Sequence, residues 1–243
     1  MDDDLSSAQQ NKLKTICDNL NLSETDHLLE IGTGWGGLAC YAATHYGCKV
    51  TTTTLSQQQF EYAAEQIKAR GLSDKVTLLL KDYRDLDGQY SKLVSVEMIE
   101  AVGHEYLGRF FRQLETLLLP GGQMLIQSIT IADQYYDQYR RGVDFIQQYI
   151  FPGGCLPSIS EMTRHIKNQT SMRISAINDY GLHYAQTLRH WMARFEQHSE
   201  QLIRLGYKTD FQRLWVFYFA YCEGGFRENN IGLVHLQATK RGV

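Results

Sequence analysis

The stretch LLEIGTGWGG, residues 28–37, places closely spaced glycines directly after a short apolar run. The apolar run predicts a buried strand over 27–31, and glycine permits the positive φ and close backbone approach that a sharp turn needs. The residues that follow, about 36–46, predict a helix whose N-terminal amides face the turn. This stretch therefore predicts a strand–turn–helix unit whose turn can hold a ligand.

Strand and helix signals alternate along the rest of the chain. An amphipathic helix is expected over 5–20, and a second helix is expected to begin at the N-cap Ser56 and to stop at Gly71. The other expected elements are strands at 49–54, 75–80, 92–99 and 122–131, and a helix at 105–119 that stops at the PGG of 120–122. This alternation predicts an α/β fold, a doubly wound and mostly parallel sheet with helices on both faces, in a single domain over 1–243.

In such sheets, ligands bind beyond the carboxyl ends of the strands. This rule selects a few short segments as candidate site residues: 32–37, 54–59, 82–84, 97–101 and 127–131. Each of them directly follows or ends an expected strand. We therefore expect the functional groups of the chain to come from these segments.

The glycine turn matches two cofactor patterns. Gly32, Gly34 and Gly37 have the G-x-G-x-x-G spacing of dinucleotide sites. The first two of these glycines, with Glu30 and Gly36, instead form the E-x-G-x-G-x-G turn of S-adenosylmethionine (AdoMet) methyltransferases. A dinucleotide site also uses an acid about 20 residues after the first glycine, but that region reads TTTTLSQQQ. Glu30 is suited to orient the turn or to meet the methionine ammonium, so the pattern favours AdoMet over NAD.

Composition narrows the class of protein. The chain has 243 residues and a net charge of −3, so no global basic field attracts nucleic acid. Its five cysteines show no C-x-x-C pairing, which argues against a zinc site or a disulfide framework. No apolar run reaches the roughly 18 residues of a membrane span, and the acidic start MDDDLSS is unlike a signal peptide. We expect a cytoplasmic protein without a bound metal or nucleic-acid partner.

Motifs beyond the glycine turn extend over nearly the whole chain. They are TLSQQQ (54–59), KDYRDL (81–86), SVEMIEAVG (95–103), YIFPGGCLPS (149–158), GLHYAQTLRHW (181–191) and CEGGFRENNIGLVHLQATK (222–240). Together with LLEIGTGWGG, they resemble the cyclopropane fatty acid synthase family. The resemblance implies that AdoMet donates a methyl group to a cis double bond in a phospholipid acyl chain. It also implies that a bound bicarbonate then accepts a proton and that the ring closes.

The resemblance further implies roles for individual residues. The methionine part of AdoMet would be held by Glu30, Gly32, Gly34, Trp35 and Gly36. The ribose side would be lined by Thr54, Leu55, Ser56 and Gln59, and the adenine would be bordered by Asp82 and Tyr83. Bicarbonate would be oriented by Glu100 and would receive hydrogen bonds from Gln127, Tyr184 and the Ile129 amide.

Two positions depart from the family pattern. Gln127 stands where bacterial synthases of this family have a histidine, and Ala101 replaces a histidine that often follows the family glutamate. Glutamine can donate a hydrogen bond to an anion but cannot titrate near neutral pH. With the stretch DQYYDQYRRGVDF (133–145), this pattern resembles the branch of methyl-branched or modified fatty acid methyltransferases. A methylated or methylenated product is therefore expected as an alternative to a cyclopropane.

A third departure is an absence. Members of the family carry a long segment before the position of Leu5, with a cysteine loop that closes over AdoMet, and nothing here matches it. We therefore expect a truncated or shortened chain that binds its cofactor weakly or is inactive alone.

The region after residue 131 is expected to face the substrate. It begins with a helical insertion at about 132–170, and its many aromatic rings either pack in the core or line an acyl tunnel. Arg140 and Arg141 are suited either to a lipid phosphate or to a solvated face. The expected partner is an unsaturated acyl lipid at the inner face of the membrane, where the protein would be peripheral, and a homodimer is left open.

Two other functions stay open at this stage. One is a small-molecule N-methyltransferase, because some alkaloid enzymes share this architecture. The other is a non-catalytic module that binds AdoMet or contacts lipid.

Overall fold

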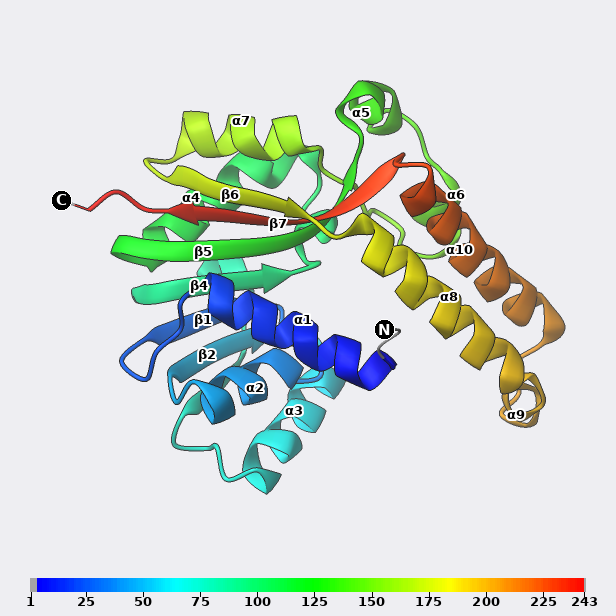
Figure 1. Cartoon of the computed structure of the whole chain (residues 1–243), viewed down its shortest axis with the longest axis horizontal. Coiled ribbons are helices and arrows are strands. Elements are labelled where there is room, and N and C mark those ends of the chain that lie inside the picture. Colours follow the sequence, from blue (N-terminus) through cyan, green and yellow to red (C-terminus); the bar gives the residue numbers. More distant parts are fainter. Residues whose placement is uncertain (1–3, 243) are drawn as a thin grey trace.

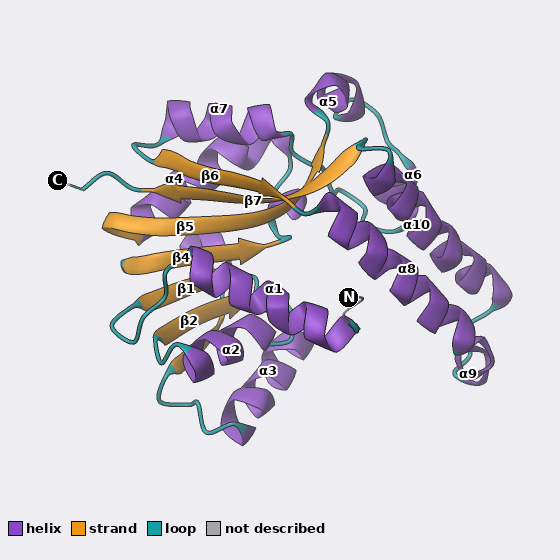
Figure 2. Cartoon of the chain, in the orientation of Figure 1, coloured by secondary structure: helices purple, strands orange, loops and turns teal. Residues whose placement is uncertain are grey.

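The computed structural model describes residues 4–242, and within them seven strands form one sheet in the order β3-β2-β1-β4-β5-β7-β6 (Figures 1 and 2). The strands are β1 (His27–Ile31), β2 (Lys49–Thr54), β3 (Val76–Leu80), β4 (Tyr90–Val96), β5 (Leu118–Ile131), β6 (Arg173–Asp179) and β7 (Ile231–Thr239). The first five run parallel, whereas β7 is antiparallel to both β5 and β6. This arrangement confirms the predicted α/β fold with a mostly parallel sheet.

Helices cover both faces of the sheet. One face carries α1 (Leu5–Asn19), α2 (Gly37–His45) and α3 (Gln57–Ala69), and the other carries α4 (Leu107–Leu117) and α7 (Ile159–Gln169). Side chains of a strand point alternately to the two faces, so β1 sends Leu28 to the first apolar cluster and Leu29 to the second. The core is therefore two apolar layers with the sheet between them.

A helical lobe stands at the end of the sheet toward which β4 points (Figure 1). It contains α8 (Gly181–Gln197), α9 (Ser199–Arg204) and α10 (Thr209–Arg227), which lie between β6 and β7 in the sequence. Leu188 of α8 and Phe219 of α10 share a third apolar cluster with Leu233 of β7. The lobe therefore adjoins the carboxyl ends of the parallel strands, where the site is expected.

Most local predictions are confirmed, including Ser56 as N-cap of α3 and the stop at Gly71, which follows the C-cap Arg70 and has positive φ. The predicted helix end at residue 119 is wrong: α4 ends at Leu117, because Leu118 is already extended and pairs with Tyr90 in the sheet. The segment 132–170 contains α5 (Asp133–Tyr139), α6 (Phe145–Tyr149) and α7. Of these, α7 packs on the sheet as part of the core.

Candidate active site

The glycine turn after β1 adopts a backbone that only glycine tolerates well. Gly32, Gly34 and Gly36 have φ values of 100°, 53° and 82°. The Gly32 amide donates to the Thr53 carbonyl at 3.1 Å, which fixes the turn against β2. A Cβ added to Gly36 would lie 3.1 Å from the Ala63 Cβ of α3, closer than such atoms ordinarily approach. The turn is thus a tight backbone cradle of the kind expected for AdoMet.

Glu30 lies buried beneath this turn. Its Oε2 accepts a hydrogen bond from the Thr52 hydroxyl at 2.6 Å, and the Thr52 hydroxyl also contacts that of Thr33 in the turn at 2.7 Å. Burial raises the pKa of Glu30 to about 8, against the opposing effect of the Thr52 hydrogen bond. Glu30 therefore reaches the turn through two hydroxyl groups, and this geometry favours its expected role in orienting the turn.

The segment expected on the ribose side follows β2. The Thr54 hydroxyl donates to Gln59 Oε1 at 2.8 Å, and the Gln59 amide donates to the capping Ser56 hydroxyl at 3.3 Å. Leu55 and Trp35 are exposed, at 71% and 59% of their surface. The hydrogen bonds thus hold the strand-to-helix turn, while two large apolar side chains remain available to a ligand.

Asp82 and Tyr83, expected beside the adenine, have internal partners. The Asp82 carboxylate accepts two hydrogen bonds from the Arg84 guanidinium, at 2.6 and 2.9 Å, and these lower the pKa of Asp82. The Tyr83 ring packs edge to face on Phe110, with 5.4 Å between centroids. Their role toward adenine stays a prediction.

Glu100 lies in the short 3-10 helix η2 (Ile99–Ala101), just beyond β4. Its Oε1 accepts hydrogen bonds from the Ile129 amide at 2.6 Å and from the Ser128 hydroxyl at 3.2 Å. Its Oε2 is buried and has no hydrogen-bond partner within residues 4–242. Burial raises the pKa of Glu100 to about 7, and the charge of Glu97 adds to the effect. A buried acceptor without a partner is costly, so this oxygen is a candidate ligand contact.

A second carboxylate, Glu97, lies in the selected segment 97–101, but the sequence predicts no role for it. It follows β4 directly, with φ at 52°, and its Oε1 accepts a hydrogen bond from Gln127 Nε2 at 2.6 Å. Its Oε2 accepts one from the Tyr184 hydroxyl at 3.1 Å. The motif SVEMIE holds two glutamates three residues apart at a strand end. That spacing is the signal that could have identified Glu97.

The network continues to His235 on β7, also unpredicted. Gln127 and His235 are directly opposite each other in the β5–β7 pair, and His235 Nε2 lies 2.9 Å from Gln127 Oε1. An amide oxygen only accepts, so Nε2 carries the proton in this bond. Burial lowers the pKa of His235 to about 4, which keeps the ring neutral. His235 thereby fixes the Gln127 amide with its NH2 group toward Glu97.

The structure thus gathers Glu100, Gln127, Ile129 and Tyr184 around the ends of β4 and β5. The three groups expected to donate to bicarbonate are already engaged by protein carboxylates: Gln127 and Tyr184 by Glu97, and the Ile129 amide by Glu100. Burial, with the charge of Glu97, raises the pKa of Tyr184 well above its usual value. As placed, these donors do not fit an added bicarbonate.

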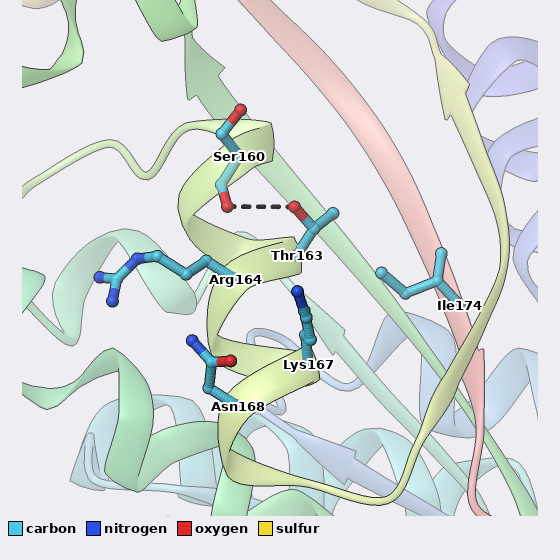
Figure 3. Close-up of a pocket in the computed structure, with 6 residues that line it drawn as sticks. All are labelled: Ser160, Thr163, Arg164, Lys167, Asn168 and Ile174. Atoms are coloured by element: carbon cyan, nitrogen blue, oxygen red, sulfur yellow. Dashed lines mark hydrogen bonds between the residues drawn. The ribbon is translucent and has the colours of Figure 1, made fainter.

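A surface groove also lies between α7 and the edge strand β6 (Figure 3). Its lining residues are Ser160, Thr163, Arg164, Lys167, Asn168 and Ile174. Arg164 is paired with Glu161 at 2.5 Å, and the Thr163 hydroxyl donates to the Ser160 carbonyl at 3.0 Å. The groove contains none of the expected site residues, so we assign the candidate site to the strand ends.

Two further findings concern the described part of the chain. No helix between residues 4 and 242 is long and apolar enough to cross a membrane. Over the same residues, no cluster of three histidine, cysteine or acidic side chains could hold a metal ion.

Comparisons with known proteins identify the family of the chain. The family model described as mycolic acid cyclopropane synthetase matches residues 1–236. The chain is 40% identical over 239 residues to the tuberculostearic acid methyltransferase UfaA1 of Mycobacterium tuberculosis, covering 98% of this chain and 56% of that protein. It is 38% identical over 242 residues to the cyclopropane-fatty-acyl-phospholipid synthase of Escherichia coli K12, covering 99% and 60%. The chain therefore spans less than two thirds of the length of these relatives.

Solved structures are similar as well. The mycolic acid cyclopropane synthase CmaA1, in complex with SAH and CTAB, superposes with a TM-score of 0.90 at 26% identity, covering 98% of this chain and 86% of that one. A cyclopropane synthase from M. tuberculosis, MmaA2, shares the fold with a TM-score of 0.88 at 24% identity, covering 98% and 86%. The sheet is that of the class I AdoMet methyltransferases, and the chain belongs to the mycolic acid cyclopropane synthetase family.

Proposed function

We propose that this chain carries the catalytic site of an AdoMet-dependent C-methyltransferase. It would transfer a methyl or methylene group to the double bond of an unsaturated acyl chain in phospholipid. The observation that carries the proposal is the unpartnered Oε2 of Glu100 beside the glycine turn. Met98, two residues before Glu100, would lie 3.6 Å from a Cβ added to Gly32. The acidic segment and the cofactor cradle are therefore neighbours.

The reaction makes separate demands on the protein. Bound AdoMet supplies the methyl group as an electrophile, for which the tight turn at Gly32–Gly36 is a suitable cradle. Transfer to an alkene leaves positive charge on the acyl chain, and a proton must then leave before a ring or a methylene group can form. Glu100 is the residue that we expect to accept this proton or to bind the group that accepts it. Its Oε2 is free for this role, because it has no hydrogen-bond partner within residues 4–242.

The helical lobe supports an acyl substrate. Phe145 of α6 meets Phe217 and Tyr221 of α10 edge to face, with centroids 4.6 and 5.7 Å apart. Tyr184 and Trp191 of α8 form a similar pair at 6.1 Å. Aromatic faces attract a cationic centre and also pack against alkyl chains. The names of two relatives, a tuberculostearic acid methyltransferase and a cyclopropane-fatty-acyl-phospholipid synthase, fit this substrate class.

The resemblance to the family also implies that bicarbonate acts as the base. The free Oε2 of Glu100 is suited to accept its hydroxyl. Glu97, however, competes with bicarbonate for the donors Gln127 and Tyr184. Peripheral binding at the inner membrane face also remains a proposal. It is supported by the lipid-acting relatives.

Two measurements test the proposal. Calorimetry should show that a full-length version of the protein binds AdoMet or its demethylated product and not NAD. Incubation with AdoMet and vesicles of unsaturated phospholipid should add one CH2 per modified double bond, detected by mass spectrometry of the acyl chains. Binding of NAD without AdoMet would refute the cofactor assignment. Methylation of small amines with unchanged lipid would instead establish the N-methyltransferase alternative.

A further inference from the structure

Glu97 presents its carboxylate in the way a bound anion would be held. Both of its oxygens are occupied by neutral donors, the Gln127 amide at 2.6 Å and the Tyr184 hydroxyl at 3.1 Å. Hydrogen bonds to a carboxylate are stronger than those between neutral groups, so these donors hold the Glu97 carboxylate firmly in place. Burial lowers the pKa of the Lys12 ammonium on α1, and attraction to the Glu97 carboxylate opposes this effect. The pocket thus already holds one negative charge.

The backbone at position 97 indicates that this placement is built into the fold. Glu97 has φ at 52°, a backbone conformation that residues other than glycine, asparagine and aspartate rarely adopt. Its amide also donates to the Gln127 carbonyl at 2.9 Å. Glu97 therefore binds Gln127 twice. Its carboxylate accepts from the Gln127 side-chain amide, and its main-chain amide donates to the Gln127 main-chain carbonyl.

Glu100 is arranged differently. Only its Oε1 is satisfied, by Ile129 and Ser128, while its buried Oε2 has no partner within the described residues. A carboxylate with a free oxygen and a pKa near 7 is well matched to general base catalysis at neutral pH. The neighbouring charge of Glu97 contributes to this raised pKa, after the larger effect of burial.

We propose that Glu97 fills the anion pocket of this site and that Glu100 Oε2 itself accepts the proton, so that turnover needs no bicarbonate. The inference rests on the proposed C-methyl transfer. In the balanced step, a C–H bond of the methylated acyl cation breaks and its electron pair closes the ring or forms the methylene double bond. The proton passes to Glu100, which becomes a neutral carboxylic acid and later releases it to solvent. Glu97 is a positioning residue.

The decisive variant is Glu97→Gly. Glycine suits φ at 52°, so the fold should survive, and loss of the carboxylate frees Gln127 and Tyr184 for another anion. Asn21→Gly is the matched control, because Asn21 also has positive φ, at 48°, and is exposed beyond the end of α1.

The first arm measures binding of bicarbonate without any need for turnover. Added sodium bicarbonate, compared with sodium chloride at equal ionic strength and pH, should raise the Tm of Glu97→Gly and leave the wild-type chain and Asn21→Gly unchanged. A rise in the Tm of the wild type would overturn the inference. So would a Glu97→Gly variant that folds but gains no stabilisation.

The second arm measures turnover in buffer freed of carbon dioxide. Wild-type turnover should not change when bicarbonate is restored, and should rise with pH through about 7 as Glu100 loses its proton. Glu97→Gly should be slower by about 10²-fold, the low end of the usual effect of a positioned acid–base group, and bicarbonate should restore much of the loss. Its pH profile should move to lower pH, since the charge of Glu97, which adds to the effect of burial on the Glu100 pKa, is gone.

Wild-type turnover that requires bicarbonate would refute the inference, whereas a wild type that never modifies lipid would refute the proposed function alone.

Discussion

Replacement of Glu100 by glutamine separates the proposed catalytic role of this residue from the effect of its buried carboxylate on the stability of the fold. The side chain keeps its shape, and the amide oxygen can still accept from Ile129 and Ser128. The variant cannot ionise, however, and cannot accept a proton. We expect lipid turnover to fall while AdoMet binding persists. Removal of a positioned acid–base group typically lowers the rate by about 10²–10⁴-fold. We expect Glu100→Ala at the severe end of this range and Glu100→Gln between the wild type and Glu100→Ala.

The stability effect follows from the raised pKa of Glu100. Burial moves this pKa from 4.5 to about 7, so between these values the folded state holds a proton that the unfolded state releases. The free energy of unfolding should therefore fall as pH rises from about 4.5 to about 7. At about 1.36 kcal/mol per pKa unit, the difference corresponds to roughly 3 kcal/mol. Glu100→Gln should lack this part of the decline.

Urea unfolding at pH 5 and pH 8 measures this difference. The wild type should lose about 2.5 kcal/mol more than Glu100→Gln between the two pH values, because part of the decline already lies below pH 5, and other titrating groups cancel in the comparison. Glu105→Gln, which removes an exposed carboxylate, is the matched control. Equal pH slopes in the wild type and Glu100→Gln would show that Glu100 is not held in a desolvated site. Near-wild-type turnover by Glu100→Ala would show that it is only a strand-end carboxylate.

Three further predictions concern its surroundings. Gly36→Ala should lower the Tm more than Gly34→Ala, because both have positive φ but only the Gly36 Cβ would be crowded; equal losses would contradict the close helix packing. Gln127→His should keep the fold, lose the acceptor for His235 at a cost of about 1–3 kcal/mol, and shift product toward cyclopropane. Adding His235→Gln should recover that stability, and an additive double-mutant cycle would disprove the coupling. Glu30→Gln should flatten the fall in stability between pH 4.5 and about 8 caused by the raised pKa of Glu30, as followed by urea unfolding, and an unchanged slope would place that carboxyl in contact with water.

Sequence reasoning succeeded where a few adjacent residues determine the structure. The backbone of the turn at Gly32 and the cap at Ser56 follow from local chemistry. Contacts between residues that are distant in the sequence could not be predicted in this way. Glu97 meets Tyr184 87 residues away, and His235 meets Gln127 across 108 residues. Glu100 was selected by its strand-end position and by the resemblance, but its free oxygen could be recognised only once neighbouring strands were in place.

The two carboxylates that follow β4 illustrate how one strand end can divide chemical roles. Residues 97 and 100 leave the strand three positions apart, and the charge of Glu97 adds to the effect of burial in raising the pKa of Glu100. The antiparallel β5–β7 pair gives the two carboxylates different partners by placing His235 opposite Gln127, which turns the Gln127 NH2 group toward Glu97. Glu97 is thereby held by donors, while Glu100 keeps an oxygen for the reaction. Neighbouring acids with different environments are the usual basis of acid–base assignment. A histidine at 127 would need a compensating change at 235, so the two positions are best regarded as one functional unit.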